Sequence, residues 1–293
     1  MFRFKNMKHM YGWLLLLPAF SLLSIFTYYP TIATLIDSFF TNKTVIRPQK
    51  FAGLDNYAFM LKDEVFITTL KNTFYFALGT VPVSIALALI MALFINQKIY
   101  GKSIVRLAYF TPTILPMVAV ANIWLFFYAP EIGLINKILE FFGYSGMNWL
   151  GNSHTVLGAL MVMTIWKEAG FFMIFYIAAL QSLPKELYEA AKIEGASSWT
   201  SFWKITFPLL MPTTFFVMIN AVLNAFKLVD HLFILTKGGP DNASNLLLYY
   251  IYETAFSFFD YSYAATLTVT LLTILMLLSL FQFSVIEKRV HYK

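Results

Sequence analysis

Six apolar stretches, each long enough to cross a lipid bilayer, constrain the fold of this chain more than any other feature of its sequence. A membrane-spanning helix needs about 20 mostly apolar residues, and stretches of that kind occur at 11–29, 69–95, 107–128, 155–181, 208–235 and 262–285. Because a bilayer offers no water to the backbone, such stretches must be helical. The sequence therefore predicts an all-α, polytopic membrane protein whose six spans form a single domain over 1–293.

The composition agrees with a lipid environment and excludes several kinds of site. Hydrophobic residues make up 59% of the chain and charged residues only 12%, whereas soluble domains carry about 25% charged residues. The net charge is +6, but the basic residues form no cluster, so nucleic acid is not indicated as a partner. The absence of Cys excludes disulfides and thiolate ligands. The four His show no metal-ligand spacing, so no metal site is predicted.

The residues beside the apolar stretches predict how the chain is oriented. Lys and Arg are enriched beside the cytoplasmic ends of membrane helices. With the N-terminus inside, each of the four inner segments holds three such residues, twelve in all, while the outer segments hold six. Both termini are therefore predicted to be cytoplasmic. The first stretch is followed by Tyr28, Tyr29 and Pro30 instead of small residues, which favours an uncleaved span over a signal peptide.

The segment 182–207, between the fourth and fifth spans, is predicted to hold a short helix, a turn and a second amphipathic piece. Pro184 suits the first turn of a helix, and Gly195 permits a sharp turn after it. The second piece carries Trp199 and Trp203. Small residues on one face let another protein approach closely, but an amphipathic loop of this kind can also rest on lipid. The residues alone leave these two interpretations open.

One pattern in this segment resembles a known family, the permease subunits of binding-protein-dependent importers. It consists of an acidic residue with two alanines, a glycine six residues after the acid, and an isoleucine and a proline before the next span: Glu189-Ala190-Ala191, Gly195, Ile205 and Pro208. In that family the loop forms a coupling helix that sits in a cleft of a cytoplasmic ATPase subunit. The resemblance implies that the ATPase-coupling residues are Glu189, Ala190, Ala191 and Gly195.

Other stretches resemble the carbohydrate branch of the same family. They are the outer turn 236–240 (Thr-Lys-Gly-Gly-Pro) with the Tyr-rich run after it, the loop motif 53–57, the pair Asn72-Thr73, the segment 133–136, and a tail at 282–292 that is similar to glycerol-3-phosphate importers. The resemblance implies a multi-pass subunit in a bacterial cell membrane, part of an ATP-binding-cassette importer for a sugar-like solute. The implied partners are a homologous second permease subunit, two cytoplasmic ATPase subunits and an extracytoplasmic solute-binding protein.

Polar residues inside the spans are the candidates for a solute pathway, since ionisable groups in a membrane usually face a cavity or a partner. Lys167 and Glu168 are adjacent, so they point to different sides of a helix and each needs a partner of its own. The predicted set, all on the fourth and fifth spans, is Trp166, Lys167, Glu168, Asn220, Asn224, Lys227 and Asp230. The i, i+3 spacing of Lys227 and Asp230 also fits an ion pair within one helix at the membrane surface.

A nucleotide site is not predicted. Gly101-Lys102-Ser103 matches only the end of a phosphate-binding loop, and Asn96 stands where the first glycine is needed. ATP and Mg are therefore expected on the partner ATPase subunits, no cofactor is expected on this chain, and the chain is not expected to be an enzyme. Two other transport functions stay open: a glycerol-3-phosphate permease of the same family, and an ion-coupled secondary transporter, which would show internal repeats and broken helices.

Overall fold

The computed structural model describes residues 2–43, 48–97 and 100–285. Helices dominate this part of the chain, and its β structure is one isolated antiparallel bridge between Phe40 and Phe51. The all-α prediction is confirmed. Part of the basis for the predicted orientation lies outside the described residues, at Lys98, Lys288, Arg289 and Lys293, as does the tail resemblance from Glu287 onward. The cytoplasmic placement of both termini stays a prediction.

Five helical segments in the described part are long and apolar enough to cross a membrane, and a bent pair of helices makes a sixth. The first crossing is α1 (Phe2–Leu23), the π-helix η1 (Ser24–Tyr28) and α2 (Tyr29–Asp37), which continue one another. The other unbroken ones are α4 (Glu64–Asn96), α8 (Val156–Ser182) and α15 (Tyr261–Val285). These match four of the predicted stretches, although the first runs on to Asp37, eight residues beyond its predicted end.

The third and fifth predicted spans differ from the straight helices expected. The stretch 107–128 is split into α5 (Lys102–Ile114) and α6 (Met117–Phe127), which are bent by 102° at the break. The stretch 208–235 holds α11 (Phe207–Leu209), α12 (Met211–Lys227) and α13 (Asp230–Leu235). Proline explains the first break, because Pro112 and Pro116 each remove a backbone N–H from the helical ladder.

The described chain divides into two compact units by its own contacts. The first comprises Met1–Asp63 and Ile251–Leu272, and the second Glu64–Tyr250 and Thr273–Lys293. Two helices, α14 (Leu247–Phe256) and α15, pass from one unit into the other. The prediction of a single permease domain therefore stays a prediction.

In the first unit, the loop motif 53–57 fixes the end of α2. Asn56, on α3 (Asp55–Met60), donates hydrogen bonds of 2.9 Å to the carbonyls of Ser38 and Phe40. Tyr57 shares a 2.8 Å hydrogen bond with the Ser38 hydroxyl, and Thr266 of α15 donates to the Ser38 carbonyl. Ser38 is fully buried, so each of its polar groups needs such a partner.

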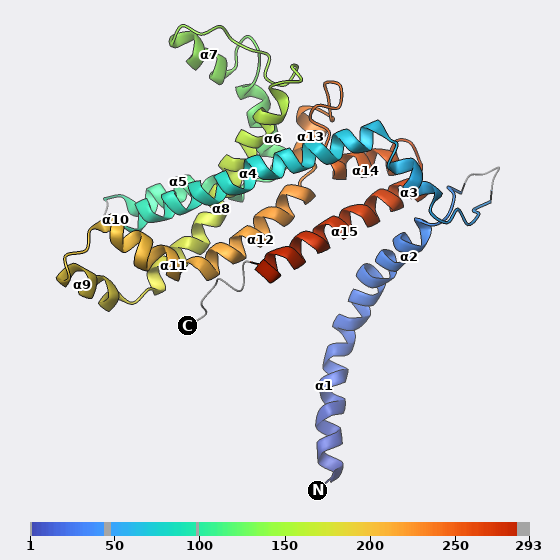
Figure 1. Ribbon diagram of the computed structural model, residues 1–293, viewed down its shortest axis with the longest axis horizontal. Coiled ribbons are helices and arrows are strands. Elements are labelled where there is room, and N and C mark those ends of the chain that lie inside the picture. The colour runs from blue at the N-terminus through green and yellow to red at the C-terminus, as the bar shows by residue number, and fades with distance from the viewer. Residues whose placement is uncertain (1, 44–47, 98–99, 286–293) are drawn as a thin grey trace. The chain divides into compact units, whose positions relative to one another are not determined.

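The core of the second unit is built from α4, α8 and α12. Small residues of α4, among them Ala88 and Ala92, are fully buried and let large residues of α8 approach closely, here Phe172 and Tyr176. Tyr176 donates a 3.1 Å hydrogen bond to Thr214 of α12, so the buried hydroxyl is satisfied across the helix interface. These three helices are shown in Figure 1, and they line the polar hollow described below.

The remaining short elements lie at the ends of this core. α9 (Lys185–Ile193), α10 (Ser198–Ser201) and the π-helix η2 (Phe202–Thr206) follow α8 at one end. α7 (Leu134–Phe141) and α6 extend from the other end (Figure 1). The predicted loop 182–207 thus contains the helix, turn and second helical piece expected of it.

Candidate functional site

The helix α9 is fixed at both ends by the residues that the sequence singled out. Pro184 precedes it in an extended conformation, and Gly195 follows it with a φ of +74°. The Gly195 N–H donates to the Lys192 carbonyl at 3.1 Å, and the Ala196 N–H donates to the Ala191 carbonyl at 2.9 Å. This is the Schellman arrangement, in which glycine supplies the left-handed residue after the helix. A side chain at Gly195 would meet no neighbour, so only its backbone conformation requires glycine.

One face of α9 packs against the rest of the chain, and the other face is exposed. Ala191 is buried against the chain, while Glu189 and Ala190 are exposed. Ile193 is 87% exposed, an unusual fraction for an isoleucine. Tyr188 shares a 3.0 Å hydrogen bond with Thr206, which ties α9 to the end of η2. The helix is therefore held from one side and free to contact another molecule from the other.

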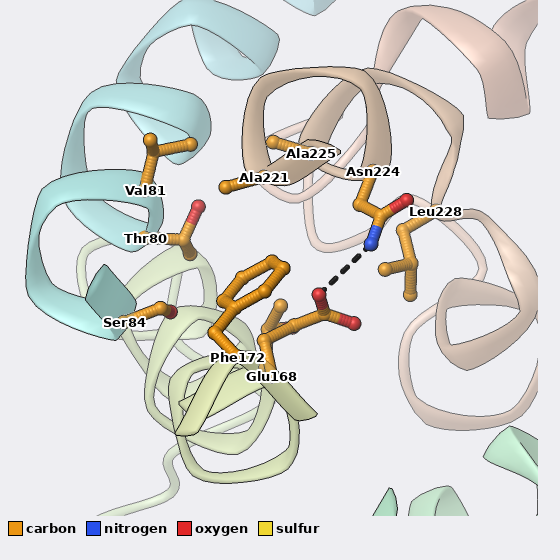
Figure 2. A pocket seen from close by; sticks show the side chains of 10 residues that line it. Thr80, Val81, Ser84, Glu168, Phe172, Ala221, Asn224, Ala225 and Leu228 are labelled. Carbon is orange, nitrogen blue, oxygen red and sulfur yellow. Dashed lines mark hydrogen bonds between the residues drawn. The ribbon is translucent and has the colours of Figure 1, made fainter. Parts of the chain in front are cut away.

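A polar pair connects α8 to α12 in the middle of the core. The Asn224 amide donates a 2.9 Å hydrogen bond to the Glu168 carboxylate (Figure 2). The two side chains line a small hollow between α4, α8 and α12, together with the hydroxyl groups of Thr80, Ser84 and Thr164. The Thr164 hydroxyl is buried and has no hydrogen-bond partner among the described residues. The hollow thus presents acceptors and hydroxyl groups, and its volume of about 10 Å³ is room for about one water molecule in this conformation.

Lys167 forms hydrogen bonds with a different helix from Glu168. Its side-chain nitrogen donates to the carbonyls of Pro112 and Leu115, at 3.0 and 2.7 Å, where α5 ends. The structure therefore gives Lys167 and Glu168 separate partners on different sides of α8, as their adjacency predicts. Trp166 beside them is 38% exposed and contacts the ring of Trp124 on α6 at a centroid distance of 5.6 Å.

The other predicted pathway residues do not join this cluster. Asn220 donates to the Phe216 carbonyl of its own helix at 2.8 Å. Lys227 and Asp230 are exposed and form no ion pair in the described structure, where the ion pair found is Lys137–Glu140. The ion pair expected within one helix is wrong because α12 ends at Lys227 and α13 begins at Asp230, so the helical i, i+3 geometry is lost.

Two motifs that are far apart in the sequence are brought together by the structure. Asn72 of α4 donates hydrogen bonds to the carbonyls of Asn242 and Asn245, at 2.8 and 3.1 Å, in the loop after the Gly-Gly-Pro turn. Its neighbour Thr73 accepts a 2.9 Å hydrogen bond from the N–H of Leu247, where α14 begins. The pair Asn72-Thr73 therefore anchors the loop 236–247 to the core.

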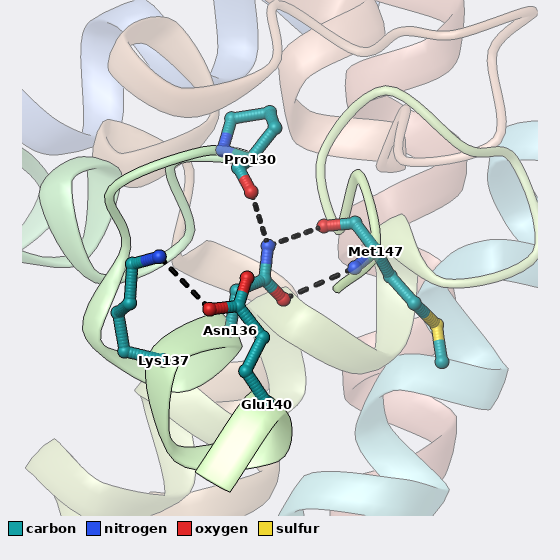
Figure 3. A network of polar contacts seen from close by, with 5 residues as sticks. All are labelled: Pro130, Asn136, Lys137, Glu140 and Met147. Atoms are coloured by element: carbon teal, nitrogen blue, oxygen red, sulfur yellow. Dashed lines mark hydrogen bonds and ion pairs between the residues drawn. The ribbon is translucent and has the colours of Figure 1, made fainter. Parts of the chain in front are cut away.

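A buried asparagine, Asn136, organises the segment between α6 and α8, where the sequence shows only the motif 133–136. Asn136 is fully buried and donates to the carbonyls of Pro130 and Met147, both at 2.8 Å (Figure 3). Its own carbonyl accepts from the Met147 N–H at 3.1 Å and the Trp149 ring nitrogen at 2.8 Å. The sequence gives no signal for this role, because three of the four hydrogen bonds of Asn136 are to backbone groups.

Comparison with known proteins identifies the family. A family model described as the inner membrane component of binding-protein-dependent transport systems matches residues 84–292. The chain belongs to this family. The match includes the whole of segment 182–207, so the resemblance of the Glu-Ala-Ala loop is confirmed at the level of the family. This permease is thus a membrane-spanning component of a transport system of the inner membrane.

Relatives of the permease are similar over nearly their full length. It is 33% identical to the sn-glycerol-3-phosphate transport system permease protein of Agrobacterium fabrum, over 96% of each chain. It is also 33% identical to the lactose transport system permease protein of Rhizobium radiobacter, over 95% of this chain and 94% of the relative.

A solved structure shows the same fold. A bacterial ABC transporter involved in the import of the acidic polysaccharide alginate contains a chain that matches with a TM-score of 0.85 at 23% identity, covering 98% of this permease and 99% of that chain. The fold expected for a permease of this class is confirmed. The roles predicted for single residues, at α9 and in the polar hollow, stay predictions.

Proposed function

We propose that this permease is one of the two membrane-spanning subunits of an ATP-binding-cassette importer for a neutral, sugar-like solute. The polar hollow carries the proposal. A sugar offers hydroxyl groups, and Glu168, Asn224 and the unpartnered hydroxyl of Thr164 offer matching acceptors and donors around one hollow. The hollow has a volume of about 10 Å³ in this conformation, so the helices must separate to admit a solute during transport. The family supplies the rest of the setting, because its members work in binding-protein-dependent transport.

The partners of Lys167 favour a neutral solute over a phosphate. A phosphate needs cationic groups that are free to bind it, and the sequence offers Lys167 as the deep candidate. Its nitrogen already donates to two carbonyls at the end of α5. Recruiting it to a solute would leave those carbonyls unsatisfied inside the membrane, where each costs several kcal/mol by order of magnitude.

In the proposed mechanism the chain itself makes and breaks no covalent bond. ATP and Mg bind to two separate ATPase subunits, which dock on α9 and on the matching helix of a second, homologous permease subunit. ATP binding closes the ATPase pair, moves the coupling helices together and opens the cavity outward. An extracytoplasmic binding protein delivers the solute at the outer loops. The exposed face of α9, with Glu189, Ala190 and Ile193, supports the docking role.

A glycerol-3-phosphate permease is the second candidate, and one observation favours it. The Agrobacterium fabrum relative, at 33% identity over 96% of this chain, is a permease for that solute. The lactose permease of Rhizobium radiobacter is equally similar, so overall similarity does not separate the two solutes.

Reconstitution in lipid with the neighbouring subunits tests both candidates. ATP hydrolysis and solute uptake are measured with candidate binding proteins loaded with neutral sugars or with glycerol-3-phosphate. We expect a sugar-loaded binding protein to raise hydrolysis several-fold, and Asn224→Leu to lower sugar uptake at least tenfold. The matched control is Asn122→Leu, since Asn122 bonds only to a carbonyl of its own helix in the described structure. Stimulation by the glycerol-3-phosphate-loaded protein alone would establish the second candidate instead.

A further inference from the structure

The break in the third span leaves two backbone carbonyls without partners from their own helix. In an unbroken helix the Pro112 carbonyl would accept from the N–H of residue 116, but residue 116 is proline and has none. Leu115 is extended, with a ψ of 134°, and the N–H of Ala119, its helical partner, donates to the Pro116 carbonyl instead. Both orphaned carbonyls lie within a membrane span, where backbone groups must be satisfied by the protein.

Lys167 satisfies both carbonyls at once. Its nitrogen lies 3.0 Å from the Pro112 oxygen and 2.7 Å from the Leu115 oxygen. A cationic side chain at the C-terminal end of a helix also interacts favourably with the helix dipole. The side chain thus does for α5 what a C-terminal cap does in a soluble protein, although it comes from another helix.

The backbone places Lys167 for this role. One turn further along α8, Gly170 lies so close to α5 that an added Cβ would be 2.2 Å from the Tyr109 carbonyl oxygen. The Thr113 hydroxyl donates in return to the Lys167 carbonyl at 3.3 Å. These contacts fix α5 on α8 over one to two helical turns on each side, with the break at their edge.

The same helix leads directly to the candidate coupling segment. α8 ends at Ser182, and α9 begins at Lys185 after only Leu183 and Pro184. Lys167 lies fifteen residues before the end of α8, or about 22 Å at 1.5 Å per residue. A displacement of α9 therefore reaches the end of α5 through a single continuous helix.

We propose that Lys167 is a positioning residue for transport, which holds the angle between α5 and α6 and transmits the movement of α8 to α6. It takes no part in solute binding. Its carbonyl contacts carry α6, whose Trp124 packs beside Trp166, along with α8. The geometric part of this inference is independent of the proposed function, and only its role in transport rests on it.

The angle at the break can be measured directly because the chain has no Cys. Spin labels are attached at Ile104→Cys on α5 and Phe126→Cys on α6, both exposed positions, in the assembled complex with cysteine-free partners. From the 102° bend, the backbone sites are about 20 Å apart, against about 33 Å for an unbroken helix. The two arrangements give clearly different distances between labels.

The variants distinguish a capping role of Lys167 from a general effect of removing a lysine from the chain. Lys167→Met is expected to broaden the distance distribution, or to lengthen its mean, by about 5 Å or more. Lys167→Arg keeps the donors and is expected to keep the wild-type distribution, whereas Lys167→Gln, with one amide donor group, is expected to be intermediate. The matched control is Lys71→Met, which removes an exposed lysine from α4.

Transport provides the second readout. Lys167→Met is expected to lower solute uptake at least tenfold, whereas Lys167→Arg is expected to keep uptake within twofold of wild type. An unchanged, narrow distance distribution in Lys167→Met, or in Lys167→Gln if the Met variant does not assemble, would overturn the proposal. Absence of stimulated hydrolysis in the wild-type complex with every loaded binding protein would instead overturn the proposed function and leave the distance result standing.

Discussion

The close approach of α8 to α5 makes an unusual prediction for glycine substitutions within one helix. Gly170→Ala places a Cβ 2.2 Å from the Tyr109 carbonyl oxygen and 3.2 Å from the Thr113 hydroxyl. The closer neighbour is backbone and cannot rotate away, so the two helices must separate by about 1 Å to restore an ordinary contact. Gly158→Ala, in the same helix, places its Cβ in open space.

The expected effects on the free energy of unfolding have opposite signs. Replacing glycine by alanine inside a helix gains about 1 kcal/mol, which is all that Gly158→Ala should show. At Gly170 overpacking costs about 1–3 kcal/mol. Separation of the helices also weakens the two hydrogen bonds from Lys167, each contributing about 1 kcal/mol. The net expectation for Gly170→Ala is a loss of about 2–3 kcal/mol, taking the middle of these ranges.

The assay is equilibrium unfolding of the purified permease in mixed detergent micelles, followed by loss of helical signal. The two variants should differ from each other by about 3–4 kcal/mol, or a few hundredfold in the equilibrium constant. The reasoning is refuted if Gly170→Ala is as stable as wild type or more stable, because the contact between α5 and α8 would then be looser than described.

Substitutions at three further residues, Asn136, Asn72 and Glu168, test the polar contacts. Asn136→Leu removes four hydrogen bonds and leaves buried backbone groups unpaired, so it should cost about 3 kcal/mol. It should also expose the loop 130–155 to proteolysis, whereas substitution of an exposed asparagine in the same loop, Asn148→Ala, should leave cleavage nearly unchanged. Asn72→Leu frees the carbonyls it holds in loop 236–247, and amide hydrogen exchange there should rise at least tenfold while exchange in α8 stays constant. Glu168→Gln keeps an oxygen that accepts from Asn224 and should assemble normally, whereas Glu168→Leu, which strands the Asn224 amide, should lower the yield of assembled complex several-fold.

The sequence predicted the helices where apolar length decides the structure. The unbroken spans α4, α8 and α15 follow from hydrophobicity, and Gly195 follows from its place after an amphipathic helix, because a left-handed residue there needs no distant contact. The polarity of Glu168 and Asn224 marked both as pathway candidates, although their direct hydrogen bond joins two helices and no local pattern encodes it.

The helix breaks and the role of Lys167 depend on which backbone groups lose or gain a hydrogen-bond partner. Pro112 and Pro116 were visible signals of a break, but the apolar residues around them favoured a straight span over 107–128. The break at Leu228 and Val229, which separates Lys227 from Asp230, has no proline or glycine to mark it. The partners of Lys167 are carbonyls that become available only because the third span breaks. The role of Lys167 therefore cannot be predicted from a sequence that favours a continuous third span.

The most direct test of the account is ATP hydrolysis by the complex reconstituted in lipid, with and without a loaded binding protein, at three versions of residue 195. Asparagine tolerates the left-handed conformation that Gly195 adopts, and β-branched valine does not. We predict that Gly195→Asn retains most of the stimulation and that Gly195→Val abolishes it while the subunits still assemble. Full stimulation in Gly195→Val, or uptake of solute by the permease alone, would contradict the assignment of α9 as the coupling helix.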